Sequence, residues 1–133
     1  EIPKRDWSSD VCSSDLLQLT TDNETYGDKT VLNPEDLLVS AVSSCHMLSY
    51  LYLCAKAGVV VMEYTDNAKG TMVEDPKGGG HFTEVVLNPV CIVSEESMVE
   101  RAQQLHHLAN KICYIANSVN FPVTHNPVCK SIA

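Results

Sequence analysis

The chain has 133 residues and a formal net charge of −8, from 9 basic and 17 acidic residues. A chain of this length can bury one hydrophobic core, and its acidic balance speaks against nucleic acid or an anionic membrane surface as a partner. Five of its six cysteines lie after residue 16, and no secretory signal is recognisable before them. We therefore expect reduced thiols in a cytoplasmic protein.

The first segment differs from the rest of the chain. Residues Asp6 to Leu16 read, codon for codon, as the translation of a common short-read sequencing adaptor. We interpret residues 1–16 as a non-native or untrusted segment and exclude them from fold reasoning; a genuine Ser/Asp-rich terminus is the alternative. Residues 17–133 are then expected to form a single domain whose native N-terminal strands have been replaced.

The next clear pattern predicts one long helix over residues 33–58. Asn33 suits the N-cap, and Pro34 suits the first helical position, where no N–H is needed. Gly58 stands where a left-handed residue ends a helix. No charged residue lies between Asp36 and Lys56, and the apolar side chains are spread around the whole helix. Such a helix has to be covered on nearly every side.

A charge-free run of this length can also cross a bilayer. The serines, tyrosines and histidine inside the run argue against a membrane span, as does the lack of positive flanking charge. We therefore interpret the helix as the buried axis of a soluble domain or of a dimer, with no membrane partner.

Two strand-like runs follow, at residues 59–74 and 82–93. They are joined by a turn at residues 75–80 that contains three successive glycines. We expect an antiparallel hairpin with a break at Asn88 and Pro89. The glycines do not form a phosphate-binding loop, because no helix follows them and no Lys-Ser/Thr pair closes the pattern.

The remaining sequence predicts a second helix and a final strand. Ser94 is the expected N-cap, and apolar residues at helical spacing give one apolar face. These residues are Met98, Ala102, Leu105, Ala109 and Ile112. Residues 113–119 continue as a turn or short helix, and residues 121–132, interrupted by prolines, end the chain as an edge strand. The predicted class is α+β, with the long helix packed against an antiparallel sheet.

The cysteines carry the most chemistry. Cys45 lies in the middle of the long helix, where desolvation is expected to raise its pKa. Cys54 is about 13 Å further along the axis, too far for a disulfide. Cys113 is the best-placed partner, because it ends a helix that has to pack on the first. Cys91 and Cys129 are interpreted as small buried strand residues.

The histidines indicate less. His46 is adjacent to Cys45 but about 100° around the helix, so it is not expected to act as the base of that thiol. No zinc-ligand spacing and no C-x-x-C motif occur. We expect neither a metal site nor a cofactor.

Three motifs together resemble a known family. They are residues 33–38 (Asn-Pro-Glu-Asp-Leu-Leu), residues 43–46 (Ser-Ser-Cys-His) and residues 113–119 (Cys-Tyr-Ile-Ala-Asn-Ser-Val). From about residue 27 onward the chain resembles the OsmC/Ohr proteins, the osmotically inducible and organic-hydroperoxide-resistance proteins, and is nearer to the OsmC-like branch. The resemblance implies an intertwined homodimer with the cysteine helices at its centre, and thiol-dependent reduction of organic hydroperoxides or hydrogen peroxide.

The resemblance also implies roles for three residues. Cys45 would be the peroxidatic thiol, Cys113 the resolving thiol, and Glu35 the carboxylate that orients an activating arginine. Cys45 would pass through a sulfenic acid to a disulfide with Cys113, which an external dithiol reduces. The family's arginine belongs to the N-terminal strands and is not found here, because neither Arg5 nor Arg101 stands at the matching place.

Two other classes of function remain open from the sequence. The same fold can serve as a non-enzymatic dimeric binding protein with an apolar pocket at its interface, in which Cys45 would react no faster than a model thiol. A small membrane-associated protein is the other alternative, and partition into the soluble fraction without detergent would exclude it.

Overall fold

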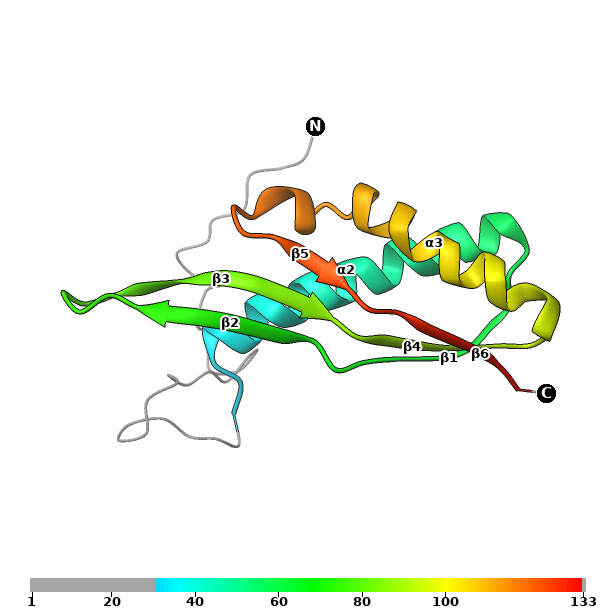
Figure 1. Cartoon of the computed structure of the whole chain (residues 1–133), viewed down its shortest axis with the longest axis horizontal. Coiled ribbons are helices and arrows are strands. Elements are labelled where there is room, and N and C mark those ends of the chain that lie inside the picture. Colours follow the sequence, from blue (N-terminus) through cyan, green and yellow to red (C-terminus); the bar gives the residue numbers. More distant parts are fainter. Residues whose placement is uncertain (1–30, 133) are drawn as a thin grey trace, which may run out of the picture. The chain divides into compact units, whose positions relative to one another are not determined.

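The computed structural model describes residues 31–132 (Figure 1). Contacts divide the chain into two compact units, residues 1–38 and 39–133, and each is described by itself. In the first unit, the Asp36 N–H donates to the side-chain oxygen of Asn33 at 2.7 Å. Asn33 is therefore the N-cap that the sequence predicts. Residues 1–16 and the expected N-terminal strands lie outside the described residues, so the domain assignment stays a prediction.

The long helix, α2, spans Pro34–Ala57. Its end is a Schellman motif, because Gly58 has a φ of 73° and the N–H groups of Gly58 and Val59 donate to the carbonyls of Ala55 and Cys54. Both predicted helix ends are thus confirmed. Within the part of the chain that the structure describes, α2 is the one helix whose length and composition would allow it to cross a membrane, a test that the core helix of a soluble protein also passes.

In the part of the chain that the structure describes, one stripe of α2 is buried. Val42, His46, Tyr50 and Cys54 follow one another at intervals of four residues, and each is almost completely shielded from solvent. Leu48 on another side of the helix is 63% exposed. Residues 31–132 of one copy therefore do not cover the helix on nearly every side, although the sequence led us to expect such cover.

The predicted hairpin is present as two pairs of strands. Strands β1 (Val61–Asp66) and β4 (Pro89–Val93) pair antiparallel, and so do β2 (Lys69–Glu74) and β3 (Gly80–Leu87). The predicted break lies at Asn88, whose backbone N–H donates to the side-chain carboxylate of Asp66 at 2.7 Å and not to a backbone carbonyl of a neighbouring strand. The first long run is interrupted as well, at residues 67–68.

The last two strands complete two three-stranded sheets. Strand β5 (Val123–His125) pairs parallel with β3, and β6 (Val128–Ser131) pairs parallel with β4. The sheet orders are β2-β3-β5 and β1-β4-β6, so the C-terminal strands occupy edges as predicted. The sheets are mixed where a purely antiparallel sheet was expected, because the chain returns to them through a helical crossover.

That crossover is built from three helical segments: η1 (Glu96–Met98), α3 (Val99–Ile112) and η2 (Ala116–Ser118). The predicted second helix is confirmed, but Ser94 is not its N-cap. The Ser94 hydroxyl contacts the Met98 sulfur at 3.5 Å, and neither helical start has a side-chain cap. The 3-10 turn η1 lies between Ser94 and the α-helix, which begins only at Val99.

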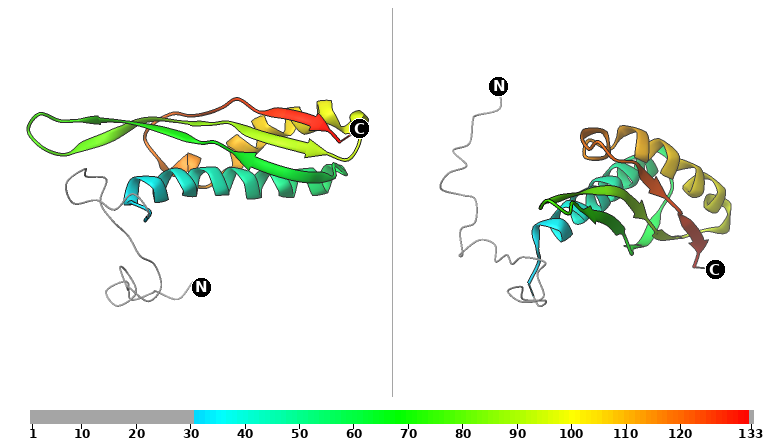
Figure 2. Two further views of the ribbon diagram at one scale, coloured as in Figure 1. Left: turned by 90° about the horizontal axis from the view of Figure 1, so that it is seen from below. Right: turned by 60° about the vertical axis from the view of Figure 1, so that its left-hand side comes forward.

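Both helices lie on the same side of the strands, as Figure 2 shows. One core cluster joins residues of α2, α3 and β4, and a second joins Val42 of α2 to Val85 and Leu87 of β3. The structure thus confirms an α+β architecture in which a cysteine-bearing helix packs against the sheets.

Two histidines lie inside this core. His46 of α2 and His106 of α3 are 3.0 Å apart through their ring nitrogens Nε2 and Nδ1, and both are fully buried. The His106 ring also stacks on Tyr50 with its centroid at 3.8 Å. Burial, followed by the charge of His125, lowers the pKa of His46 to about 4, and burial and the charge of His46 lower the pKa of His106 to about 3. Both rings are therefore neutral at pH 7.

This pair predicts a loss of stability in mild acid. The unfolded chain protonates both imidazoles near pH 6.5, whereas the folded chain resists protonation down to about pH 4, so the unfolded state binds more protons in this window. We expect the free energy of unfolding to fall by more than about 1 kcal/mol as the pH drops through it. Urea titrations at a series of pH values measure this slope. His106→Gln should flatten it and the exposed His107→Gln should not; equal slopes in both variants would contradict the assignment.

Candidate functional site

The candidate site begins with Cys45, halfway along α2. Cys45 directly precedes His46, which belongs to the buried stripe of α2. The Cys45 side chain therefore lies beside that stripe and is only partly shielded from solvent. The segment facing it is the junction between α3 and η2. There the thiol of Cys113 and backbone groups of Tyr114 and Ile115 interact with the Cys45 sulfur.

Cys113 reaches this place because α3 ends there. Its backbone is extended, with φ −68° and ψ 115°, which turns the chain out of the helix. The side chain is fully buried, and its sulfur accepts a hydrogen bond from the Ala116 N–H at 3.5 Å. The carbonyl of Cys113 accepts another from the Asn117 N–H at 3.1 Å, which fixes the turn into η2. The structure therefore brings Cys45 and Cys113 together from segments 68 positions apart in the sequence.

The two thiols differ in acidity. Desolvation raises the pKa of Cys45, but the hydrogen bond from Cys113 and those from the backbone of Ile115 and Tyr114 outweigh it, and the pKa lies below its ordinary value. Burial and the interaction with Cys45 raise the pKa of Cys113. Cys45 is thus the more acidic thiol of the pair, and its sulfur accepts the hydrogen bond from the Cys113 thiol.

This arrangement corrects one expectation. The sequence predicts a raised pKa for Cys45, because the nearest charged side chain on its helix is distant and the surroundings are apolar. In the structure the donors come from another segment, at the α3–η2 junction, and the pKa is lowered. No signal in the sequence placed those backbone N–H groups against Cys45, since their position depends on where α3 ends.

Glu35, the third predicted site residue, lies in the first turn of α2 and belongs to the first unit. One of its carboxylate oxygens, Oε2, is buried and has no hydrogen-bond partner among residues 31–132. A buried carboxylate oxygen without a donor is costly, and a cationic donor is the usual partner. The role given to Glu35 by the family resemblance remains a prediction.

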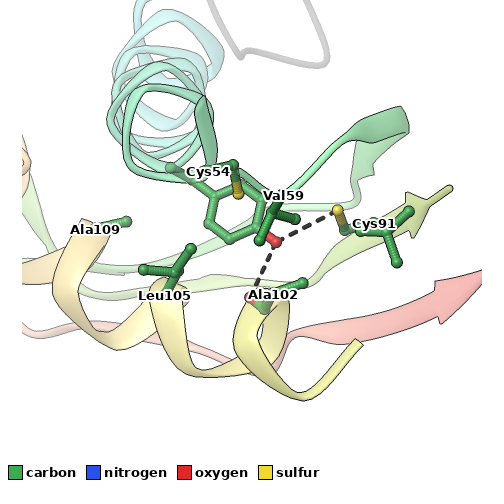
Figure 3. Close-up of a cluster of buried hydrophobic side chains, with 8 residues drawn as sticks. Cys54, Val59, Cys91, Ala102, Leu105 and Ala109 are labelled. Atoms are coloured by element: carbon green, nitrogen blue, oxygen red, sulfur yellow. Dashed lines mark hydrogen bonds between the residues drawn. The ribbon is translucent and has the colours of Figure 1, made fainter. Parts of the chain in front are cut away.

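Sequence reasoning missed a second group of thiols. The Tyr50 hydroxyl lies 3.4 Å from the Cys91 sulfur and 3.8 Å from the Cys129 sulfur, and Cys54 also contacts it. Figure 3 shows Cys54 and Cys91 in this cluster, with the bonds from the hydroxyl to Cys91 and to the Ala102 carbonyl dashed. The interpretation of Cys91 as a buried strand residue is confirmed, whereas Cys129 is half-buried.

The described residues offer no evident place for a metal ion. Among residues 31–132, no group of three or more His, Cys, Asp or Glu side chains has an arrangement that would bind one.

Comparisons with known proteins agree on one family. The model of the OsmC-like protein family matches residues 27–127. An OsmC-like protein of unknown function from Vibrio cholerae is 38% identical, with a TM-score of 0.69, over 77% of this chain and 68% of that one. No curated protein matches the chain.

Two more distant structures share the fold. An organic hydroperoxide resistance protein from Legionella pneumophila is 17% identical, with a TM-score of 0.64, over 87% of this chain and 81% of that one. Another, from Elizabethkingia anophelis, is 22% identical, with a TM-score of 0.60, over 80% of this chain and 73% of that one. With the matched family model and the Vibrio cholerae relative, these findings show that the chain belongs to the OsmC/Ohr family.

Proposed function

We propose that this protein is a thiol-dependent peroxidase that reduces organic hydroperoxides, with Cys45 as the peroxidatic thiol and Cys113 as the resolving thiol. The observation that carries the proposal is the contact between these two thiols, in which Cys45 is the more acidic partner. A low-pKa thiol beside a second thiol is the arrangement that reversible two-cysteine chemistry needs. Family membership supports a hydroperoxide-resistance or redox role at the level of the family.

The first step of the proposed reaction uses the Cys45 thiolate. Its sulfur attacks the terminal oxygen of the hydroperoxide, the O–O bond breaks, and the alkoxide takes a proton to leave as an alcohol. Cys45 becomes a sulfenic acid and has lost two electrons. Hydrogen bonds from the Ile115 and Tyr114 backbone favour the attacking thiolate.

The second step uses Cys113. Its sulfur attacks the Cys45 sulfenic sulfur, a disulfide forms, and the hydroxide takes the Cys113 proton to leave as water. An external dithiol then exchanges with the disulfide and returns both cysteines to thiols. All cysteines of residues 31–132 are free thiols in the structure. We propose that the protein acts in the cytoplasm, where dithiol reductants are present.

Glu35 is proposed to hold an activating cation. Its buried and unpartnered Oε2 fits the resemblance, in which a carboxylate at this position orients an arginine from the N-terminal strands. None of the groups that set the pKa of Cys45 within the described part of the chain is a cation. An arginine would therefore add to the thiolate stabilisation and would stabilise the departing alkoxide.

We further propose that two copies of the chain cover each other's long helix. One copy buries a single stripe of α2, and it leaves Leu48 63% and Tyr52 58% exposed on a helix with no charge between residues 36 and 56. Apolar surface of this kind is covered at lowest cost by the same surface of a second copy.

The proposed reaction predicts a defined disulfide. One equivalent of cumene hydroperoxide should oxidise the chain to a Cys45–Cys113 bond, found by peptide mapping under non-reducing conditions. In Cys113→Ser the second step is blocked, so a sulfenic acid at Cys45 should accumulate and react with dimedone. Cys54→Ser is the matched control on the same helix and should behave like the wild type. A Cys45 that reacts no faster than a model thiol would favour the binding-protein alternative.

The proposed role of Glu35 predicts an effect that depends on the N-terminus. Replacing residues 1–16 by the gene's own upstream sequence should raise the rate of Cys45 oxidation by about 100-fold, because the arginine contributes charge at the reacting oxygen. Alanine in place of that arginine, or Glu35→Gln, should remove the gain. In the chain as printed, Glu35→Gln should change the rate little. Equal rates with and without the replaced segment would exclude the arginine role.

The proposed dimer predicts a difference between two exposed leucines. Leu48→Asp places a charge on the open side of α2 and should shift the sedimentation coefficient from dimer to monomer at micromolar concentration. Leu108→Asp changes a leucine of α3 that is 43% exposed and should leave the dimer intact. A wild-type chain that sediments as a stable monomer would contradict the proposal.

A further inference from the structure

Three described cysteines take no part in the proposed peroxidase chemistry. Cys54, Cys91 and Cys129 gather around the Tyr50 hydroxyl, nearer the C-terminal end of α2 than Cys45. Cys45 and Cys54 are nine residues apart, or about 13 Å along the helix axis. The pair formed by Cys45 and Cys113 and the cluster around the Tyr50 hydroxyl are therefore two separate sites in the same unit.

Within the second group, Cys91 and Cys129 are direct neighbours. They are register partners on the parallel strands β4 and β6. Neighbouring strands lie about 4.8 Å apart, and disulfides form between Cα atoms about 4.4–6.8 Å apart. One Tyr50 oxygen lies within 3.8 Å of both sulfurs, so both side chains are on the same face of the sheet. Backbone spacing and side-chain direction both permit a bond.

The two thiols are also chemically unequal. The hydrogen bond from Cys129 lowers the pKa of Cys91 to about 7 against the opposing effect of burial, and the Tyr50 hydroxyl adds to the lowering. The same hydrogen bond and burial raise the pKa of Cys129. Cys91 is therefore the more acidic thiol of the pair, and the hydrogen bond between them runs from the Cys129 thiol to the Cys91 sulfur.

The less acidic thiol, Cys129, is the one more accessible to solvent. Cys91 is fully buried, whereas Cys129 is half-buried on β6, a four-residue strand at the edge of its sheet. Short edge strands open at a lower free-energy cost than strands in the middle of a sheet. A reagent from solution therefore meets Cys129 first.

We propose that Cys91 and Cys129 are a second redox pair, independent of Cys45 and Cys113, which closes to a reversible disulfide between β4 and β6 when the protein meets a low-molecular-weight disulfide. The bond would tie the C-terminal edge strand to the central strand of its sheet. The closed loop contains α3 and Cys113.

The reaction proceeds by two exchanges. The Cys129 sulfur gives its proton to solvent and attacks one sulfur of the external disulfide, which forms a mixed disulfide and releases one small thiolate. The Cys91 thiolate then attacks the Cys129 sulfur, forms the protein disulfide and releases the second small thiolate. The protein loses two electrons and the external disulfide gains them. A dithiol reverses both steps.

Cys54 is the competing partner within the cluster. It is buried on α2, its hydrogen bond is to the Tyr50 hydroxyl, and burial raises its pKa. It shares no register position with either strand cysteine. The geometry therefore favours Cys91 over Cys54 as the partner of Cys129, and Cys54 provides a matched control.

The test is disulfide mapping of the whole folded chain after treatment with oxidised glutathione. Free thiols are then blocked with N-ethylmaleimide, and chymotrypsin, which cleaves after Tyr114, places Cys113 and Cys129 on different peptides. We expect a linked peptide pair containing Cys91 and Cys129, lost on treatment with dithiothreitol. It should form equally in Cys54→Ser and in Cys45→Ser, which separates this result from the fate of the proposed peroxidase.

Two variants test the order of the steps. Cys91→Ser should leave Cys129 as a stable glutathione mixed disulfide, because the first exchange still occurs and the second does not. Cys129→Ser should leave Cys91 unmodified, because no reagent reaches it directly. Cys91 and Cys129 both recovered as blocked free thiols in the oxidised wild type, or Cys129 linked to Cys54, would overturn the proposal. The wild-type mapping decides this even if a variant folds poorly.

Discussion

The packing of one helical stripe determines the rest of the structure. Val42, His46, Tyr50 and Cys54 are the buried residues of α2 in the described part of the chain, and together they contact β3, β4 and α3. Tyr50 makes the most connections, because its ring stacks on His106 and its hydroxyl donates to the Ala102 carbonyl at 3.0 Å. A stripe that uses a tyrosine and a histidine fixes the rotation of α2 more strictly than aliphatic residues would, since hydrogen bonds require direction as well as contact.

That rotation positions both groups of thiols. With the stripe against the core, Cys45 faces the end of α3, while Cys54 and the Tyr50 hydroxyl face β4 and β6. The end of α3 matters equally, because the extended backbone of Cys113 brings the N–H groups of the following residues toward Cys45. The acidity of Cys45 therefore depends on tertiary packing and not on the helix that carries it.

The sequence predicted the local elements well because their signals are local. Asn33 and Gly58 mark the ends of α2 by their capping chemistry, and the break at Asn88 follows from the proline after it. The prediction that Ser94 is the N-cap of the second helix was wrong, because the 3-10 turn η1 separates Ser94 from α3. The sequence indicated Cys113 only as the best-placed candidate partner for Cys45. The sequence of neither helix determines how the two helices pack against each other.

The contacts that the sequence did not reveal arise from pairing over long separations. Cys91 and Cys129 meet because β6 adds to β4 in parallel, after a crossover that contains the whole of α3. A shift of β6 by one residue would turn Cys129 to the opposite face of the sheet. Gln103 of α3 sets this register, because its side chain accepts a hydrogen bond from the Cys129 N–H at 3.1 Å and donates one to the Pro127 carbonyl at 2.8 Å.

The electrostatics of the described core separate these thiols from the other buried groups. Burial keeps His46 and His106 neutral by lowering their pKa values, and it keeps Tyr50 neutral by raising its pKa. Among the described groups whose pKa is shifted, only Cys45 and Cys91 are shifted toward the charged form. For each of these two cysteines, the largest effect that lowers the pKa is a hydrogen bond from a second thiol in a distant segment, and it acts against the rise caused by burial. The fold therefore places a partner thiol beside each of the two described cysteines whose pKa is lowered.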